Sequence, residues 1–299
     1  MTTYSSYDLV EYGMPLKRRE HPLPAPEGAQ VLVRITRAGV CHSDIHIAEG
    51  FFDLGEEGRM TMSGRGMVLP VTLGHEIGGE VVTVGSSADP SLVGKPVLVF
   101  PWIGCGQCLA CREERSNDCM KMRMIGLMRN GGYATHVLVP DQKFLVDAEG
   151  LNLDTATPHT CSGLTVYSAL KKLLPLREGE WLAVMGTGGL GLNGIAIARA
   201  MGQESIVAVD VDPAKLEAAM EMGATAKLDA SRDDALEELR EITGNRLLGV
   251  LDTFGGPATA RLAVHALVKT GRYLVVGLHG GDFKMPLPWL PQKALTVRG

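Results

Sequence analysis

Four of the six cysteines in this 299-residue sequence lie within one short segment, at the spacing C-x2-C-x2-C-x7-C. They are Cys105, Cys108, Cys111 and Cys119. Four thiolates this close together can surround one Zn²⁺ tetrahedrally and leave no open position, which predicts a structural zinc site. An iron–sulfur cluster fits less well, because the ferredoxin run ends in a shorter spacing followed by proline, whereas Met120 follows here.

The other two cysteines, Cys41 in GVCHSDIH and Cys161 in HTCSGL, flank a GHE segment that contains His75 and Glu76. Two thiolates and one imidazole supply three metal ligands and leave a fourth position for water or substrate, which is typical of a catalytic zinc. The spacing alone does not show that these positions meet in the fold. Taken singly, each cysteine could be an apolar core residue and the histidine a hydrogen-bonded turn residue.

A glycine-rich segment, LAVMGTGGLG at 182–191, contains Gly186, Gly188 and Gly191 in the pattern G-x-G-x-x-G. A strand-like run precedes it, a helix-like run follows, and Asp210 ends the next strand-like run, as in a dinucleotide-binding βαβ unit. There the glycines allow a tight turn, close approach of a pyrophosphate and close helix–sheet packing. The carboxylate favours the ribose diol of NAD over the 2′-phosphate of NADP. The alternative is an ordinary strand–helix turn with a surface aspartate.

The sequence divides into two regions with different residue patterns, and these regions must position the candidate residues. The first 150 residues contain short β-like runs interrupted by glycine and proline, which indicates a barrel or sandwich-like β domain. From about residue 152, apolar strands alternate with helices, which predicts βαβ units around a parallel sheet. Strands are predicted at 31–35, 81–84, 97–100, 133–139, 181–185, 206–209, 247–251 and 273–276, and helices at 162–173, 190–201 and 259–268. A further helix is capped by Asp212, begins at Pro213 and ends before Gly223.

The composition is that of a globular protein, with 45% apolar residues, 21% charged residues and a net charge of −5. This acidic balance does not provide the electropositive surface that nucleic acid requires, so no nucleic-acid partner is expected. No stretch is long and apolar enough for a membrane span, and the N-terminal segment lacks the apolar core of a secretory signal. These features predict a cytoplasmic protein with reduced thiols.

The segments GVCHSDIH, LGHE, CGQCLACREERSNDC and VMGTGGLG, in this order, resemble the motifs of zinc-dependent medium-chain alcohol dehydrogenases. The resemblance extends along essentially the whole sequence. It implies an α/β fold with a β-rich N-terminal part: a GroES-like catalytic domain with the structural-zinc loop at 1–152, and a Rossmann domain with a doubly wound parallel sheet at 153–299. Family members continue for about fifty further residues that return to the catalytic domain, a segment expected to be missing here.

By position, the resemblance assigns the catalytic zinc to Cys41, His75 and Cys161. It places Glu76 beside the metal and makes Asp44 the hydrogen-bond partner that orients His75. Ser43 corresponds to the hydroxyl that contacts the substrate oxygen, and His46 to the end of a proton relay. For the cofactor, the implied contacts are His42 at the pyrophosphate, Thr165 beside the nicotinamide, the turn residues Gly186, Gly188, Gly189, Leu190 and Gly191, the ribose contacts Asp210 and Lys215, and the strand end Val276, Gly277 and Leu278.

The insert at 51–70 is longer than in many family members, and with PWIGCG at 101–106 it resembles a subgroup that includes 6-hydroxyhexanoate dehydrogenases. That subgroup implies a medium-chain primary alcohol or an ω-hydroxy acid as substrate, with Trp102 and Ile103 near the substrate pocket. The alternative is that the insert is a surface loop and that Trp102 only packs.

The resemblance therefore implies reversible oxidation of a small-molecule alcohol to an aldehyde or ketone, with hydride transfer to NAD. It also implies two Zn²⁺ per chain and a homo-oligomer, either a dimer or a tetramer. Within the same superfamily, a secondary-alcohol or polyol dehydrogenase is an alternative, although polyol enzymes often carry glutamate in place of Cys161. A zinc-free reductase would lack Cys41 and the four-cysteine loop. A non-catalytic zinc- and nucleotide-binding protein is the alternative from a different class.

Overall fold

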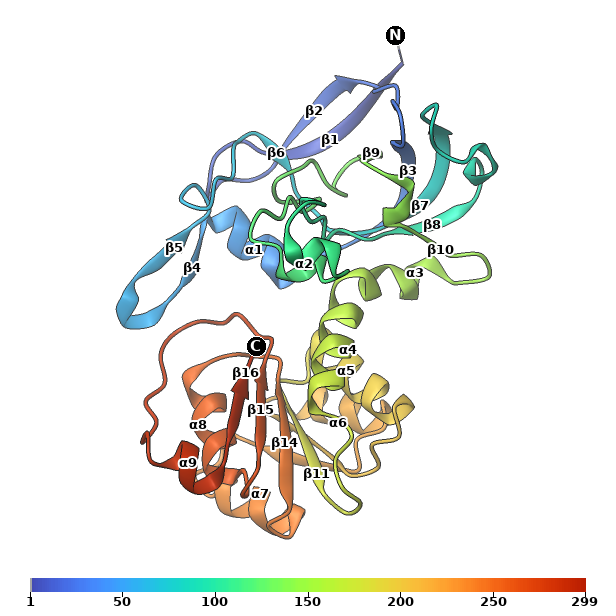
Figure 1. The fold of residues 1–299 in the computed structure, drawn as a ribbon. Coiled ribbons are helices and arrows are strands. Elements are labelled where there is room, and N and C mark those ends of the chain that lie inside the picture. The colour runs from blue at the N-terminus through green and yellow to red at the C-terminus, as the bar shows by residue number, and fades with distance from the viewer. Residues whose placement is uncertain (1) are drawn as a thin grey trace. The chain divides into compact units, whose positions relative to one another are not determined.

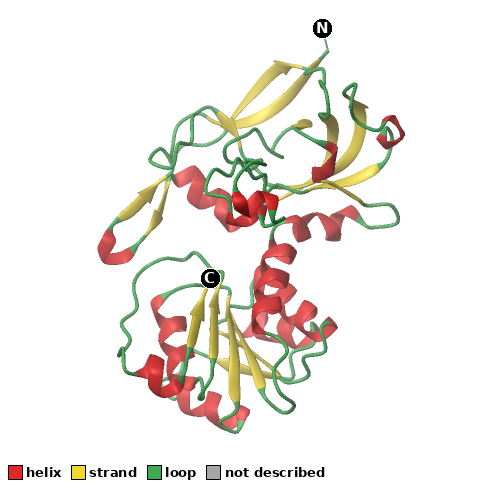
Figure 2. Cartoon of the chain, in the orientation of Figure 1, coloured by secondary structure: helices red, strands yellow, loops and turns green. Residues whose placement is uncertain are grey.

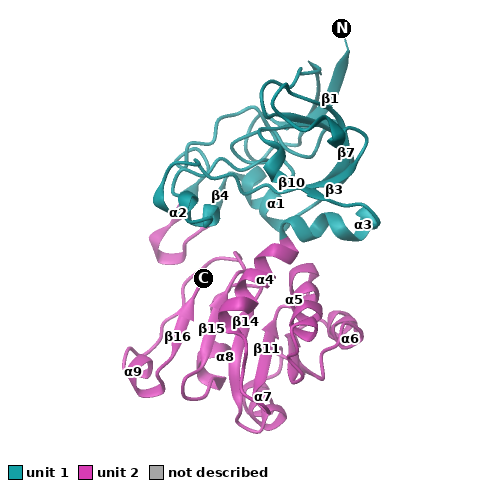
Figure 3. Cartoon of the chain, turned by 45° about the vertical axis from the view of Figure 1, so that its right-hand side comes forward, with its two compact units in different colours: residues 1–52, 60–161 teal, residues 53–59, 162–299 magenta. Residues whose placement is uncertain are grey.

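The computed structural model describes residues 2–299 and divides the chain into two compact units, coloured separately in Figure 3. The first unit extends to residue 52 and continues over 60–161, and the second comprises 53–59 and 162–299. The tip of the insert thus groups with the second unit. The boundary at residue 152 concerns functional domains and stays a prediction.

Antiparallel strands dominate the first unit (Figures 1 and 2). One sheet has the strand order β10-β8-β7-β3-β9 and another the order β2-β1-β6, while β4 and β5 form a hairpin in the insert. The strands are β1 (Thr3–Leu9), β2 (Lys17–Pro22), β3 (Val31–Gly39), β4 (Phe51–Asp53), β5 (Arg59–Thr61), β6 (Val71–Thr72), β7 (Glu76–Val84), β8 (Pro96–Val99), β9 (His136–Val139) and β10 (Leu145–Asp147).

The larger sheet of the first unit covers an apolar core because β-branched residues alternate along its strands. Val31 and Val33 of β3 are fully buried, as is Ile77 of β7, and they pack with Val97 and Val99 of β8. β7 pairs antiparallel with both β3 and β8. It is therefore an interior strand, hydrogen-bonded along both of its edges.

Short helices connect these strands. They are α1 (His42–Glu49), α2 (Leu109–Arg112) and α3 (Leu153–Ala156), together with the 3₁₀ turns η1 (Gly55–Glu57), η2 (Pro90–Leu92), η3 (Ser116–Asp118), η4 (Gln142–Phe144) and η5 (Thr157–Thr160). α1 ends at Gly50, whose φ of 94° is the left-handed conformation that glycine adopts at low cost.

The second unit is built on a parallel sheet of order β13-β12-β11-β14-β15-β16. Its strands are β11 (Trp181–Met185), β12 (Ile206–Asp210), β13 (Ala226–Asp229), β14 (Leu247–Asp252), β15 (Arg272–Val275) and β16 (Thr296–Arg298). Its helices are α4 (Ser162–Leu173), α5 (Gly189–Ala200), α6 (Pro213–Glu221), α7 (Ala235–Thr243), α8 (Pro257–Ala266) and α9 (Trp289–Lys293).

Helices cover both faces of this sheet, as Figure 1 shows. Successive strand residues point to opposite faces, so Leu182 packs with residues of α4, α5 and α6, whereas Ala183 packs with residues of α7 and α8. Burial on both faces explains why the sequences of β11, β12 and β14 consist almost entirely of apolar residues. The predicted doubly wound parallel sheet is confirmed.

The predicted elements of the second unit agree with the structure to within a few residues. Asp212 caps α6 by accepting a hydrogen bond from the Ala214 amide at 2.9 Å, and Pro213 begins the helix. The sequence did not predict β13, β16, α7 or α9 of this unit. In the first unit it did not predict β1 or β2, which form a hairpin-like antiparallel pair. Most of the side chains of β2 are exposed and polar, so no apolar alternation marks it. Within residues 2–299, no helix is both long and apolar enough to cross a membrane.

Candidate zinc and cofactor sites

Cys41 lies between the end of β3 and the first turn of α1, for which it is the N-cap residue. Its backbone N–H donates to Oδ2 of Asp44 at 3.1 Å, which fixes the start of the helix. A sulfur at a helix N-terminus faces free N–H groups and a positive potential, an arrangement that favours a thiolate.

His75 precedes β7 directly and is 2% exposed. Its Nδ1 lies 3.0 Å from Oδ1 of Asp44, which is itself 3% exposed. Because the ionised carboxylate only accepts hydrogen bonds, this contact places the proton on Nδ1 and leaves Nε2 as the electron-pair donor. The structure therefore brings together the predicted ligand and its predicted orienting carboxylate.

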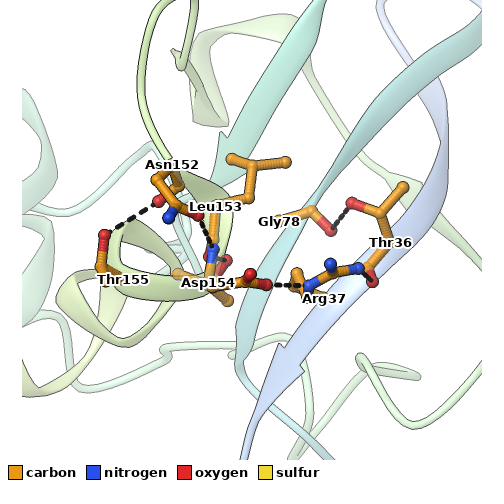
Figure 4. Close-up of polar contacts among 8 residues, drawn as sticks. Thr36, Arg37, Gly78, Asn152, Leu153, Asp154 and Thr155 are labelled. Carbon is orange, nitrogen blue, oxygen red and sulfur yellow. Dashed lines mark hydrogen bonds and ion pairs between the residues drawn. The ribbon is translucent and has the colours of Figure 1, made fainter.

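Cys161 is positioned by the segment α3–η5, which is fixed against β3 and β7 (Figure 4). Asp154 of α3 forms an ion pair with Arg37 of β3. The Thr157 hydroxyl donates to the Leu153 carbonyl at 2.6 Å, and a Cβ on Gly78 of β7 would come within 2.4 Å of that hydroxyl oxygen. Glycine at this point of β7 therefore permits the close approach that carries the chain to Cys161.

The three donor atoms converge, although their residues are far apart in sequence. Sγ of Cys41 lies 4.0 Å from Sγ of Cys161, Nε2 of His75 lies 3.3 Å from Sγ of Cys161, and all three atoms lie within 4.8 Å of one another. Tetrahedral bonds of about 2.3 Å to sulfur and about 2.0 Å to nitrogen would place the two sulfurs about 3.8 Å apart and each sulfur about 3.5 Å from the nitrogen. These residues therefore fit a zinc ion.

The charges of this group also favour a cation. The Cys161 thiol and, against the effect of burial, His75 lower the pKa of Cys41 to about 4. Burial alone would lower the pKa of His75, but hydrogen bonds from its ring to Asp44 and Cys41 raise it to about 10. The contact with Cys41 raises the pKa of Cys161, and burial adds to this effect. A zinc ion bound here would displace the protons that these shifts leave on Cys161 and on Nε2 of His75, beside the Asp44 carboxylate.

The four clustered cysteines form a second group whose sulfurs also lie within 4.8 Å of one another. The Cys105 amide donates to Sγ of Cys119 at 3.3 Å, and the Cys108 amide donates to Sγ of Cys105 at 3.4 Å. A Cβ on Gly104 would come within 2.5 Å of Sγ of Cys111, so glycine permits the loop to close around its sulfurs. Four thiolates with backbone N–H donors to sulfur fit a structural zinc site.

The glycine turn in the second unit has the geometry that its sequence predicts. Gly186 has a φ of 83°, which strains any other residue, and a Cβ on Gly191 would lie 1.9 Å from the Gly186 carbonyl oxygen, so Gly191 has no room for a side chain. In contrast, a Cβ on Gly188 would meet nothing within 4 Å. Gly188 therefore leaves open space directly at the N-terminus of α5, where backbone N–H groups attract a phosphate.

Asp210 ends β12 and faces this turn. Its Oδ2 accepts hydrogen bonds from the Thr187 amide at 2.7 Å and the Thr187 hydroxyl at 3.1 Å, and its Oδ1 accepts from the amides of Val211 and Asp212. Burial raises the pKa of Asp210, but these N–H donors outweigh it and the net pKa is lowered. The carboxylate is held ionised and its rotamer is fixed, whereas Lys215 on α6 is exposed.

Comparison with known proteins decides the family. Residues 27–149 match the alcohol dehydrogenase GroES-like domain, and residues 189–299 match the zinc-binding dehydrogenase domain. An NAD-dependent alcohol dehydrogenase of Sulfurisphaera tokodaii is 41% identical over 94% of this chain and 80% of its own length. The chain belongs to the zinc-dependent alcohol dehydrogenases. It is an NAD-dependent alcohol oxidoreductase of that family.

Other relatives of this dehydrogenase agree. An NAD-dependent alcohol dehydrogenase of Saccharolobus solfataricus is 39% identical over 97% of this chain and 83% of its own length. Among solved structures, the alcohol dehydrogenase of Aeropyrum pernix superposes with a TM-score of 0.87 at 30% identity, covering 99% of this chain and 84% of that one. The D-arabinose dehydrogenase of Sulfolobus solfataricus also gives 0.87, at 27% identity, covering 100% of this chain and 88% of that one.

Glu76, Ser43 and His46, which the resemblance assigned to the catalytic site, and His42, which it assigned to the cofactor pyrophosphate, all lie within the first unit. A Cβ on Gly39 would come within 1.9 Å of Oε2 of Glu76, so the glycine permits the buried glutamate side chain to lie against β3. His42 and His46 lie one turn apart on α1, with ring centroids 4.9 Å apart. Ser43, which follows His42 in the sequence, is half-buried. Their roles stay predictions.

The two predicted substrate-pocket residues have different environments within the first unit. Ile103 is 4% exposed and packs into the core under the larger sheet, whereas Trp102 is half-buried. The core position explains why a large apolar residue stands at 103 whatever the substrate. The contribution of either residue to a substrate pocket stays a prediction.

Sequence reasoning missed Tyr133, whose hydroxyl donates to Oδ2 of Asp44 at 2.9 Å. It also missed Thr187 and the buried pair Asp252 and Tyr273. Each pair joins residues on different elements, so no local pattern links them. The available signal was the polar residue type at the end of an apolar run, as at Asp252, the last residue of β14.

Proposed function

We propose that Cys41, His75 and Cys161 hold the catalytic zinc of this alcohol dehydrogenase and that the four clustered cysteines hold a structural zinc. The convergence of two sulfurs and one imidazole nitrogen, with Asp44 on the far side of the ring, carries this proposal. The three ligands leave a fourth position, as catalytic zinc requires, whereas four cysteines leave none.

Different side chains around this site have different roles in alcohol oxidation. When bound, zinc lowers the pKa of an alcohol and NAD accepts the hydride. Asp44 keeps His75 in the tautomer whose Nε2 faces the sulfurs. Ser43, in the first turn of α1, accepts a hydrogen bond from the alcohol hydroxyl and so positions its oxygen, while the proton that the alcohol releases goes to His46. His46 lies 3.7 Å from the Glu49 carboxylate and passes that proton towards solvent.

The cofactor is proposed to bind along the carboxyl ends of β11 and β12. The N-terminus of α5 and the open backbone at Gly188 accommodate the pyrophosphate. The carboxylate of Asp210 accepts a hydrogen bond from the ribose diol in place of the one from the Thr187 hydroxyl, and it repels a 2′-phosphate, so NAD is favoured over NADP.

The test is NADH formation from NAD with a panel of alcohols, followed by the near-ultraviolet absorbance of NADH. Cys41→Ala and His75→Ala should each abolish turnover and lower the zinc content by one ion per chain. His136→Ala, which removes a histidine from β9 of the same unit, is the matched control and should keep both. Unchanged turnover in the two ligand variants would refute the assignment of these residues.

For the substrate, we propose a medium-chain primary alcohol or an ω-hydroxy acid. The insert at 51–70, with its β4–β5 hairpin, and the segment 101–106 support this subgroup. Comparing kcat/KM for hexanol and 6-hydroxyhexanoate tests it directly. Other relatives are named sorbitol dehydrogenase (Bacillus subtilis, 30% identical) and L-galactonate-5-dehydrogenase (Escherichia coli, 32% identical), so polyols belong in the same panel. A preference for polyols or cyclic secondary alcohols would exclude the subgroup.

Two further expectations complete the proposal. The clustered cysteines, proposed here as zinc ligands rather than disulfides, support a cytoplasmic location, which imaging of a tagged chain would check. A homo-oligomer, dimer or tetramer, is expected, and light scattering coupled to gel filtration would measure it.

A further inference from the structure

Asp252, the last residue of β14, is a fully buried carboxylate with no part in the site described above. Its Oδ2 accepts a hydrogen bond from the Tyr273 hydroxyl at 2.7 Å. Its Oδ1 accepts from the backbone amides of Phe254 at 3.0 Å and Gly255 at 2.8 Å. Burial of a carboxylate is costly unless every oxygen has donors, and here both oxygens have them.

The loop that this carboxylate holds, residues 253–256, supports the glycine turn. The Thr253 hydroxyl lies 2.6 Å from the Gly186 carbonyl oxygen, to which it donates, and the Thr253 amide donates to the Met185 carbonyl at 2.9 Å. A Cβ on Gly186 would come within 3.1 Å of the Thr253 hydroxyl oxygen. The loop therefore lies in direct contact with the backbone that is proposed to hold the pyrophosphate.

The same residue also holds the segment after β15. The backbone carbonyl of Asp252 accepts hydrogen bonds from the amides of Val276 at 2.9 Å and Gly277 at 3.1 Å. A Cβ on Gly277 would lie 2.1 Å from the backbone carbon of Phe254, so the two segments are in contact. The Phe254 ring stacks on His279 with a centroid distance of 4.2 Å. One buried residue thus joins both segments.

The place of these segments in the sheet connects them to the cofactor. The chain proceeds from β11 to β12 on one side and later returns to β14 on the other, so the strand order reverses between β11 and β14. Ligands of doubly wound sheets bind beyond the carboxyl ends of the strands at this reversal. Residues 253–256 and 276–279 follow the carboxyl ends of β14 and β15, next to that point.

We propose that Asp252 is a positioning residue for NAD, which fixes residues 253–256 and 276–279 against the glycine turn without touching the cofactor. Tyr273 completes the hydrogen bonding of its carboxylate. This inference rests on the proposed cofactor site and adds a residue that acts through the backbone. A loop already held in its bound conformation costs less to order when NAD binds, so loss of the anchor should weaken NAD specifically.

Three variants separate the parts of this arrangement. Asp252→Ala removes all three side-chain acceptor contacts. Asp252→Asn keeps an oxygen for the two amides and supplies an amide group that can donate to the Tyr273 oxygen. Tyr273→Phe removes only the hydroxyl. With hydrogen bonds to a carboxylate among the stronger ones in proteins, we expect the Kd for NAD to rise about tenfold or more in Asp252→Ala, and less than about threefold in Asp252→Asn.

The measurement is calorimetric titration of the zinc-loaded enzyme with NAD, well below the Tm of each variant, together with KM for NAD and for the alcohol. KM for NAD should rise while KM for the alcohol and the zinc content stay unchanged. Leu239→Ala removes a fully buried side chain of α7 from the same apolar core as Tyr273 but touches none of these hydrogen bonds, and it is the control that lowers Tm alone. It should keep the wild-type Kd.

The results distinguish the inference from the function on which it rests. If the wild type binds NAD and folded Asp252→Ala binds it equally well, Asp252 is only structural and the inference is wrong. If Asp252→Ala does not fold, Tyr273→Phe decides: a Kd raised by about threefold supports the inference and a wild-type Kd overturns it. A wild type that does not bind NAD at all overturns the proposed cofactor site and this inference with it.

Discussion

Tyr133→Phe is the substitution that tests the zinc assignment most sharply, because it removes one oxygen atom at a distance from the ligands. The Tyr133 hydroxyl donates to Asp44 at 2.9 Å, and Asp44 in turn orients His75 at 3.0 Å. Burial raises the pKa of Tyr133, and the Asp44 carboxylate raises it further, so the hydroxyl stays a donor throughout the neutral range. The variant phenylalanine keeps the ring and its packing.

The expected size follows from the donors that remain. Asp44 still accepts from Nδ1 of His75, from the Cys41 amide at 3.1 Å and from the Gly74 amide at 3.4 Å. Loss of an outer partner of a metal-bound histidine commonly costs about 10- to 100-fold in metal affinity. With three donors retained, we expect the lower end, about tenfold, which corresponds to ~1.4 kcal/mol.

The assay is competition for zinc between the protein and a chromogenic chelator, with the release of one ion per chain resolved from that of the other. Only the ion held by Cys41, His75 and Cys161 should be released more easily in Tyr133→Phe, and turnover at saturating zinc should fall less than zinc affinity. Tyr7→Phe, at an exposed tyrosine of β1, is the matched control and should leave both ions unaffected. Equal zinc affinity in Tyr133→Phe and wild type would show that the contact to Asp44 does not orient His75.

Three further outcomes are expected. Gly191→Ala should lower Tm strongly because its Cβ would lie 1.9 Å from a carbonyl oxygen, whereas Gly188→Ala should keep Tm and weaken NAD binding; equal effects of the two in thermal melts and NAD titrations would contradict the assigned roles. Because the pKa of Asp210 is lower in the folded protein, its carboxylate stabilises the fold when the pH is above the unfolded pKa of about 3.9. This contribution is lost as the pH falls through the folded pKa. The difference in unfolding free energy between wild type and Asp210→Asn should therefore narrow in urea titrations below about pH 4, and a difference independent of pH would refute it. Cys108→Ser should remove one zinc per chain and lower Tm while the NAD affinity of the folded fraction is retained; elemental analysis showing both ions present would overturn the structural-zinc site.

The sequence by itself determined the elements whose signals are local. Alternating apolar runs and the Asp212–Pro213 start signal predicted four of the six strands and four of the six helices of the second unit, because both faces of its sheet are buried and the pattern is dense there; β13, β16, α7 and α9 were not predicted. The four-cysteine loop and the glycine turn could also be predicted from the sequence, since their ligands or backbone contacts come from neighbouring residues. In the first unit, the exposed polar strand β2 gave no such signal.

Only the tertiary structure decided which distant residues meet. Cys41, His75 and Cys161 come together because β3 and β7 pair and because α3–η5 packs on them through Gly78. The partners of Asp44, Asp210 and Asp252 likewise lie on other elements. Such contacts depend on strand pairing and on the space left by single glycines. Neither property repeats along the chain, so no period or spacing in the sequence encodes them.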